Sequence, residues 1–297
     1  MRGVNRLRAT DLHAAMPSHR QICMLSSGGE GSGAFWSTAP ARPPLRTANA
    51  QWAMATRARL GLTAPPRRGL SCSLRNADDD EPCGAPLDES LHHPSLCPKG
   101  RTGRLIGHIA VAAALRRHVT RTGTFVDAER HVPELCIQKA NGDVEERIMD
   151  LVVAWPASGQ QFLLDVTVRS PFASELRHQH LQPGVAARNG EKDKLAHYGP
   201  SVTPFAVELF GQLGPAALHA LAAMHMVSCE CGRLRPGTGR ASALNLRAVR
   251  ADLEAAVVQS AAQQAMASSL QALGWAGRRA QRAAHAGVGG QGGGARR

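Results

Sequence analysis

The chain has 297 residues, of which 43% are hydrophobic, and its 35 Lys and Arg against 23 Asp and Glu give a formal net charge of +12. This length allows one sizeable core with irregular flanks, or two small domains. No apolar run approaches the roughly 20 residues needed to span a bilayer, so we expect no transmembrane segment and no membrane partner. The basic surplus favours an anionic partner such as nucleic acid, although an arginine-rich composition can also reflect a G+C-rich gene.

The cysteines and the N-terminal region bear on the cellular context. Seven cysteines without the spacing of a disulfide framework favour reduced thiols or metal ligands. Residues 1–44 are basic, rich in Ser, Gly and Pro, and lack the apolar core of a secretory signal. Such a composition buries too little surface to order itself, so we expect a disordered leader there, which could also serve as a transit peptide.

The first half of the chain predicts two helices and one strand before its central motif. A short helix and a cysteine-bearing loop would occupy residues 45–100. Apolar residues recur at helical spacing from Arg104 to Arg121, and residues 125–132 alternate weakly, as a strand would. A compact domain would then extend over residues 101–228.

The central motif is a β-hairpin within residues 147–171. Two runs rich in Val, Ile, Leu and Phe flank residues 155–160, which have the composition of a turn. A turn centred in this stretch puts Asp150 almost opposite Asp165, on one face of the sheet. Both faces are largely apolar, so helices should cover both. Opposed carboxylates destabilise a strand pair unless a cation lies between them.

The second half of the chain adds one strand and several helices. We expect a polar helix over 185–198, a short strand over 204–210 and a helix over 215–227. A linker (229–243), an alanine-rich helix (244–276) and a disordered Gly/Arg-rich tail (277–297) would follow. The order helix, three strands, helix, strand, helix predicts an α/β fold with a mixed four-stranded sheet flanked by helices.

The two aspartates of the hairpin form a candidate site for Mg²⁺ or Mn²⁺. A hard divalent cation prefers oxygen ligands, and Asp150, Asp165 and the Val166 carbonyl could supply them. A cation held there can activate water and stabilise charge on a phosphoryl oxygen. A nearby lysine would orient or deprotonate the water, with Lys194 as first choice and Lys192 as second. The alternative is that one aspartate lies in solvent or pairs with a neighbouring arginine, Arg147 or Arg169.

A second candidate site lies in the cysteine-bearing loop. Thiolates and imidazole at short spacings in a Pro- and Gly-rich loop suit tetrahedral zinc. The candidate ligands are Cys72, Cys83, His93 and Cys97, with His92 as an alternate. Their spacing is irregular, and unrelated thiols with a surface histidine are the alternative. A further thiol pair, Cys229 and Cys231, is interpreted as structural or incidental.

Three basic side chains are candidates for contact with phosphate. Arg104 and His108 lie one helical turn apart and share a face. They would either contact phosphate beside the acidic pair or form an ordinary solvated pair. Arg169 ends the second strand of the hairpin and would also face the phosphates.

Taken in order, these motifs resemble a known module. A resemblance to the zinc knuckle of site-specific non-LTR retrotransposon and related reverse-transcriptase-like proteins is carried by Cys83-Gly84-Ala85-Pro86-Leu87-Asp88 and His93-Pro94-Ser95-Leu96-Cys97. The set that follows is similar to the restriction-like endonuclease module of the PD-(D/E)XK superfamily. It comprises Arg104…His108, Asp150, Leu164-Asp165-Val166-Thr167-Val168…Pro171, Lys194…Tyr198 and Val207-Glu208-Leu209-Phe210-Gly211. The resemblance covers about residues 35–227.

The resemblance implies Mg²⁺-dependent cleavage of DNA by a restriction-endonuclease-like domain. Asp150 and Asp165 would bind the metal, and Lys194 would replace the lysine usually found where Thr167 stands. Glu208 matches a glutamate often seen in that strand. The zinc ligands would be Cys72, Cys83, His93 and Cys97.

The sequence also departs from the family pattern. Met149 stands where a proline would precede the first aspartate, and Glu81 stands where such knuckles have their first cysteine, so that Cys72 would substitute from a longer loop. The upstream residues are too few for a polymerase domain, and we expect a detached C-terminal piece of such an element. The expected function is a metal-dependent DNA endonuclease, nuclear if active, with RNA as an alternative partner. The rivals are an inactive nucleic-acid-binding remnant and an interaction protein without nucleic-acid role.

Overall fold

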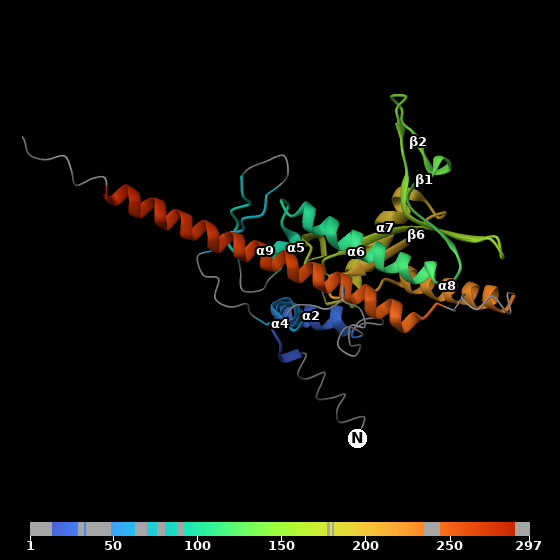
Figure 1. The fold of residues 1–297 in the computed structure, drawn as a ribbon, viewed down its shortest axis with the longest axis horizontal. Helices are drawn as coiled ribbons and strands as arrows, with labels where there is room; N and C mark the ends of the chain where they lie inside the picture. The colour runs from blue at the N-terminus through green and yellow to red at the C-terminus, as the bar shows by residue number, and fades with distance from the viewer. Residues whose placement is uncertain are drawn as a thin grey trace, which may run out of the picture.

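The computed structural model describes residues 14–28, 33, 49–62, 70–75, 81–87, 92–176, 179, 181–234 and 244–288. Within this part of the chain a mixed four-stranded sheet is flanked by helices, as the sequence predicted (Figure 1). None of the helices described is long and apolar enough to cross a membrane.

The sheet has the strand order β1-β4-β5-β6. β1 (Phe125–His131) pairs antiparallel with β4 (Ile148–Trp155), and β4 pairs antiparallel with β5 (Gln160–Arg169), which confirms the hairpin. β6 (Thr203–Glu208) pairs with β5 in parallel. A parallel pair needs a crossover connection, and α7 (Val185–Tyr198) lies in it.

Helices cover both faces of the sheet. α6 (Arg101–Thr120), α8 (Pro215–Leu234) and α9 (Leu246–Val288) form the main core with one face. A smaller cluster on the other face joins Val152 to Tyr198 of α7. Adjacent residues of a strand point to opposite faces. Because Leu151 belongs to the main core and Val152 to the smaller cluster, the two clusters lie on opposite faces of the sheet. The largest buried side chains of the main core include Trp155, Phe205, Leu115, Leu164, Leu221, Met224 and Leu253.

Three expectations about irregular segments are wrong. α2 (Ser18–Gly28) lies inside the expected disordered leader and contacts α4 (Asn49–Arg59), the predicted short helix. α8 continues to Leu234, so the two cysteines expected in a linker lie on a helix. α9 continues to Val288, through much of the expected tail. Packing on a neighbouring helix orders α2, and the high helix propensity of Ala and Arg extends α9. Apart from residues 14–17 and 33, the rest of the leader, linker and tail lies outside the described residues.

α9 connects the N-terminal helices to the sheet domain. His118 of α6 lies 2.7 Å from Asp252 of α9, measured from Nε2 to Oδ2. The buried Glu254 of α9 forms an ion pair with Arg59 of α4, and that guanidinium also donates to the Ser27 carbonyl of α2 at 2.9 Å. These contacts fix α2, α4 and α6 to one helix.

A small arm projects beside the outer end of the sheet (Figure 1). It contains η2 (Pro133–Leu135), β2 (Ile137–Gln138) and β3 (Val144–Glu145), which the sequence did not predict because two-residue strands carry no periodicity. Near its base Glu129 has a φ of 52° and is skipped in the pairing of β1 with β4. The register is the same on both sides of Glu129, so the pairing is interrupted there without an extra residue in either strand.

Two buried glutamates accept hydrogen bonds from backbone N–H groups at the N-termini of helices. Glu208 of β6 accepts hydrogen bonds from the N–H groups of Ala186 and Ala187 at 2.9 and 3.3 Å, at the start of α7. Glu191 of α7 accepts the corresponding bonds from the first turn of α8 at 2.9 and 3.2 Å. A carboxylate at a helix N-terminus fills donors that have no partner within the helix. Glu208 therefore has a structural role.

We expect Glu208→Ala to lower the free energy of unfolding by about 2 kcal/mol, because two buried N–H groups lose their acceptor. Urea unfolding measures the change. The control is Glu230→Ala, at an exposed position of α8, which should change the same quantity by less than about 0.5 kcal/mol. Equally small changes in both variants would contradict the capping role of Glu208.

Candidate functional site

Asp150 of β4 and Asp165 of β5 meet where the two strands part. The pairing of the hairpin ends at Leu151↔Leu164. Beyond this point a side chain replaces the backbone acceptor of the partner strand: the Val166 N–H of β5 donates to Asp150 Oδ2 at 2.6 Å. The two carboxyl groups lie close enough for each to shift the pKa of the other. The predicted proximity of the two aspartates is therefore confirmed.

Each of these carboxyl groups has a basic partner from a different helix. His108 of α6 lies with Nε2 3.0 Å from Asp150 Oδ1. Lys194 of α7 lies with Nζ 3.0 and 2.8 Å from the two oxygens of Asp165. We call Asp150, Asp165, His108 and Lys194 the acidic fork. The side chain of Asp165 is 5% exposed and that of Lys194 is 25% exposed, so a buried carboxylate lies directly behind an accessible amine.

The environment shifts the pKa values of the two aspartates in opposite directions. Burial raises the pKa of Asp165 to about 6, although the Lys194 ammonium opposes this. Burial also acts to raise the pKa of Asp150, but the hydrogen bond with His108 and the neighbouring Asp165 carboxyl group outweigh it and leave that pKa below its ordinary value. The hydrogen bond to Asp150 in turn raises the pKa of His108. In mild acid the pair therefore holds a proton on Asp165.

We expect the raised pKa of Asp165 to make stability depend on pH. Between about pH 4 and 6 the folded chain binds this proton more tightly than the unfolded chain, so stability falls as pH rises through that window and levels off above it. Urea unfolding should show wild type losing roughly 1–3 kcal/mol relative to Asp165→Asn across the window.

The control for this pH series is Asp193→Asn, which removes a carboxylate that is 60% exposed on α7. Its difference from wild type should stay within about 0.5 kcal/mol throughout, because an exposed ion pair contributes little. A pH-independent difference between wild type and Asp165→Asn would show that the buried carboxyl group does not titrate as described.

The other basic residues predicted for the site have different partners. Arg169 pairs with Asp193, Nη2 to Oδ2, at 2.7 Å. Arg104 donates to the Cys97 carbonyl at 2.8 Å, and so links α6 to the cysteine-bearing loop. Lys192 is exposed on α7 and lines a hollow with Arg169, so Lys194 is the lysine that reaches the aspartates.

Two further groups lie beside the acidic fork: the sequence predicted no role for Tyr198 and suggested Arg147 only as the alternative partner of an aspartate. Burial, together with the nearby carboxylate of Asp165, raises the pKa of Tyr198 to about 12. Arg147 lies with Cζ 5.1 Å from the centre of the Tyr198 ring and pairs with Glu145 of β3 at 3.0 Å. The spacing of four residues from Lys194 to Tyr198 on a helix was an available signal. Arg147 offered none, since its partner comes from the unpredicted arm, and the suggested pairing with an aspartate is wrong.

The four predicted zinc ligands converge. One ligand atom from each of Cys72, Cys83, His93 and Cys97 lies within 4.8 Å of all the others. Cys72 Sγ is 3.7 Å from Cys97 Sγ, and Cys83 Sγ is 3.5 Å from His93 Nε2. Tetrahedral zinc, with bonds of about 2.3 Å to sulfur and 2.0 Å to nitrogen, separates its ligands by about 3.5–3.8 Å. This cluster can hold a metal ion such as zinc.

Local backbone pairing brings Cys72 to the other ligands. The Cys72 N–H donates to the Ala85 carbonyl at 2.7 Å, and the Gly84 N–H donates to the Cys72 carbonyl at 2.9 Å. Gly84 has a φ of 71°, a conformation that glycine adopts without strain, directly after Cys83. α5 (His93–Leu96) carries the histidine and ends at the last cysteine.

The remaining candidates of this region lie outside the cluster. Glu81 is exposed, which agrees with Cys72 as the fourth ligand. The ring of His92 stacks on Phe172, with centroids 3.4 Å apart, so His92 is not the alternate ligand. Among the residues that the structure describes, neither Cys229 nor Cys231 joins a group of three or more potential metal ligands.

We expect the purified chain to bind one Zn²⁺, or Co²⁺ with the visible absorption of a tetrahedral thiolate complex, because three thiolates and an imidazole match those ions. Burial raises the pKa of the Cys97 thiol to about 12, and a bound cation would lower it by favouring the thiolate. Cys72→Ser should abolish the Co²⁺ spectrum. Cys136→Ser, outside the cluster, is the control and should retain it, and an unchanged spectrum in Cys72→Ser would exclude this ligand set.

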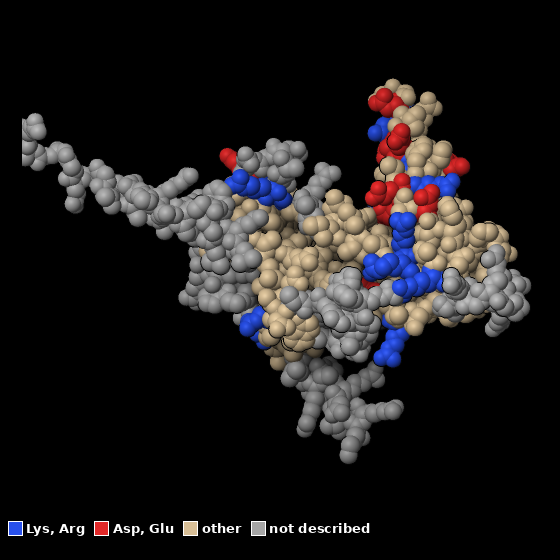
Figure 2. Space-filling model, in the orientation of Figure 1, with Lys and Arg blue, Asp and Glu red and all other residues tan. Residues whose placement is uncertain are grey.

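A basic surface lies on the C-terminal part of α6. A shallow hollow there is lined by Ala113, Arg116, Arg117, Thr120 and Arg121, and the three arginines are exposed. Figure 2 shows Lys and Arg side chains gathered near this end of α6, while Asp and Glu side chains line the projecting arm. On the face that Figure 2 shows, most acidic side chains thus lie on the arm.

Comparison with known proteins adds no family to these observations. The chain matches no protein-family model, and no curated protein matches it significantly.

Proposed function

We propose that the chain is a Mg²⁺- or Mn²⁺-dependent DNA endonuclease whose catalytic residues are Asp150, Asp165 and Lys194. The observation that carries the proposal is the convergence of two carboxyl groups and one amine from β4, β5 and α7. Hydrolysis of a phosphodiester needs a positioned water and a counter-charge for the phosphoryl oxygen. Two carboxylates can hold the cation that would supply this counter-charge, and the lysine beside them can position the water.

The donor set of the fork fits a hard divalent cation. Carboxylate oxygens from Asp150 and Asp165, with the Val166 carbonyl beside them, are the ligand type that Mg²⁺ and Mn²⁺ prefer. When bound, such an ion supplies an activated water and charge stabilisation at the phosphoryl group. Asp165 is buried beside a second carboxyl group, and added positive charge would relieve that repulsion.

The chain's own residues would then orient the reactants. In the proposed reaction the Lys194 ammonium would turn from Asp165 toward the attacking water and orient it by donating a hydrogen bond to its oxygen. His108 would hold Asp150 in place through the bond from Nε2 to Oδ1. The basic hollow on α6 and Arg169 would attract the DNA backbone. The resemblance of the ordered motifs to restriction-like nucleases supports the same fold and reaction.

A non-catalytic nucleic-acid-binding protein is the second candidate. One observation favours it, because Lys194 contacts both oxygens of Asp165 and His108 contacts Asp150, so protein groups already neutralise the fork. Such a remnant would bind DNA or RNA through its basic surface, with or without a divalent cation.

We expect the wild-type chain to nick plasmid DNA in Mg²⁺ or Mn²⁺, and Asp165→Asn to lower the rate by at least about 10²-fold. Lys194→Met should lower it comparably, since it removes the amine beside the water. Lys192→Met is the matched control, because this exposed lysine lies two residues away on the same helix, and its rate should stay within about threefold of wild type.

Binding of labelled duplex, measured at several salt concentrations in the same variants, separates the two candidates. Binding retained in Asp165→Asn while nicking is lost supports the nuclease. Metal-independent binding by a wild type that never nicks contradicts it and supports the non-catalytic protein.

A further inference from the structure

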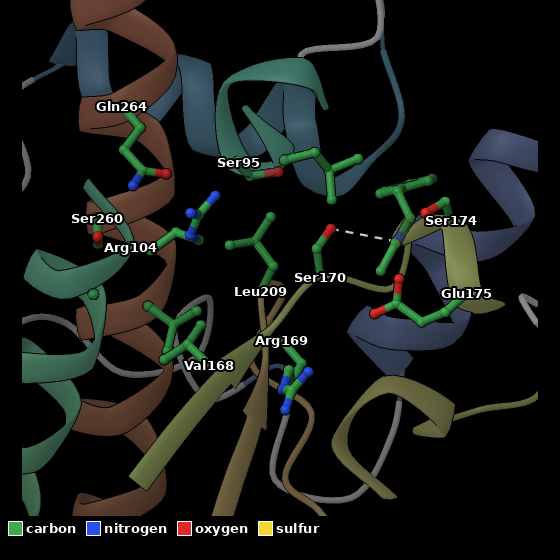
Figure 3. Close-up of a pocket in the computed structure, with 15 residues that line it drawn as sticks. Ser95, Arg104, Val168, Arg169, Ser170, Ser174, Glu175, Leu209, Ser260 and Gln264 are labelled. Atoms are coloured by element: carbon green, nitrogen blue, oxygen red, sulfur yellow. Dashed lines mark hydrogen bonds between the residues drawn. The ribbon is translucent and has the colours of Figure 1, made fainter. Parts of the chain in front are cut away.

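A pocket of about 390 Å³ lies beside the acidic fork, where α5, α6, the end of β5 and α9 meet. This volume is within the roughly 300–1,000 Å³ of small-molecule sites. Figure 3 shows its lining, with Arg104 and Gln264 on one side, Glu175 on the other, and Leu209 and Ser170 between them.

The lining combines the groups that recognise a nucleotide. Leu209 and Val257 offer an aliphatic surface for the flat ring of a base. The Gln264 amide both donates and accepts, which suits the edge of a base. Arg104 uses one N–H on the Cys97 carbonyl, which fixes the side chain and leaves other donors of the guanidinium for a phosphate.

The pocket and the acidic fork are connected by one face of α6. Arg104 and His108 lie on one face of α6, about 6 Å apart along the helix axis at 1.5 Å per residue. His108 contacts Asp150, and Arg104 lines the pocket. One nucleic-acid strand advances about 3.4 Å per phosphate when stacked. A strand with a phosphate at the fork would therefore bring a nucleotide within about two positions to the pocket.

We propose that this pocket binds one unstacked nucleotide of the substrate strand. The inference rests on the proposed function. It specifies the substrate as DNA that carries an unpaired or extruded nucleotide close to the cut. A stacked base in a duplex cannot enter a pocket walled by four parts of the chain, so the base has to leave the stack. A free nucleoside monophosphate has the same chemistry, and the experiment distinguishes the two sources.

The test compares binding of two labelled duplexes without added Mg²⁺ or Mn²⁺, one fully paired and one with a single bulged 2-aminopurine. Wild type should bind the bulged duplex about tenfold more tightly, and the 2-aminopurine fluorescence should change on binding. Gln264→Trp, which fills the pocket, should bind both duplexes equally. Gln263→Trp is the matched control, since this neighbouring residue of α9 is exposed and lies outside the pocket.

Other arms of the experiment separate this proposal from the nuclease. Thermal unfolding verifies that both tryptophan variants are folded, and Ser170→Ala, a smaller change in the lining, should reduce the preference only in part. Equal affinity of wild type for both duplexes overturns the pocket proposal, as does binding of free 2-aminopurine nucleoside monophosphate with no preference for the bulge. A preference that persists in wild type and Asp165→Asn, without nicking by either, supports the pocket and overturns only the nuclease.

Discussion

The rest of the domain depends on two carboxyl groups placed where β4 and β5 part inside a largely apolar sheet. An isolated charge in such a place is costly unless opposite charge or hydrogen bonds compensate it. Asp150 accepts a hydrogen bond from the Val166 N–H and contacts His108. Asp165 accepts a hydrogen bond from the Lys194 ammonium. Because these partners come from α6 and α7, both helices have to pack at the end of the sheet where the strands separate. Packing and electrostatics therefore select the same arrangement.

The cysteine cluster and α9 hold α6 in that arrangement. Arg104 joins the first turns of α6 to the carbonyl of a cluster cysteine, one helical turn from the histidine at the fork. The contact between His118 and Asp252 fixes the other end of the helix to α9. A metal ion in the cluster would stabilise the loop at one end of this chain of contacts. The cysteine cluster and the acidic fork are thus connected through a single helix.

Much of the fold followed from local patterns. Alternating apolar residues predicted β4 and β5, and their symmetry about the turn brought Asp150 opposite Asp165. Short spacings in a Gly- and Pro-rich loop predicted the cysteine cluster, including the distant Cys72. The arm and α2 were not predictable, because two-residue strands have no period and α2 is ordered by a helix distant in sequence. The roles of Arg147 and Tyr198 depend on that tertiary packing, and local patterns do not encode it.

The most direct test of the central claim is calorimetric titration of Mn²⁺ into the wild-type chain and into the Asp150→Asn/Asp165→Asn double variant. The chain should first be saturated with zinc, so that the cysteine cluster does not take up the added ion. We predict that wild type binds one additional Mn²⁺ and that the double variant binds none at this site. If wild type binds no Mn²⁺, or the double variant binds it equally well, the two carboxyl groups are structural and the acidic fork is not a metal-dependent catalytic centre.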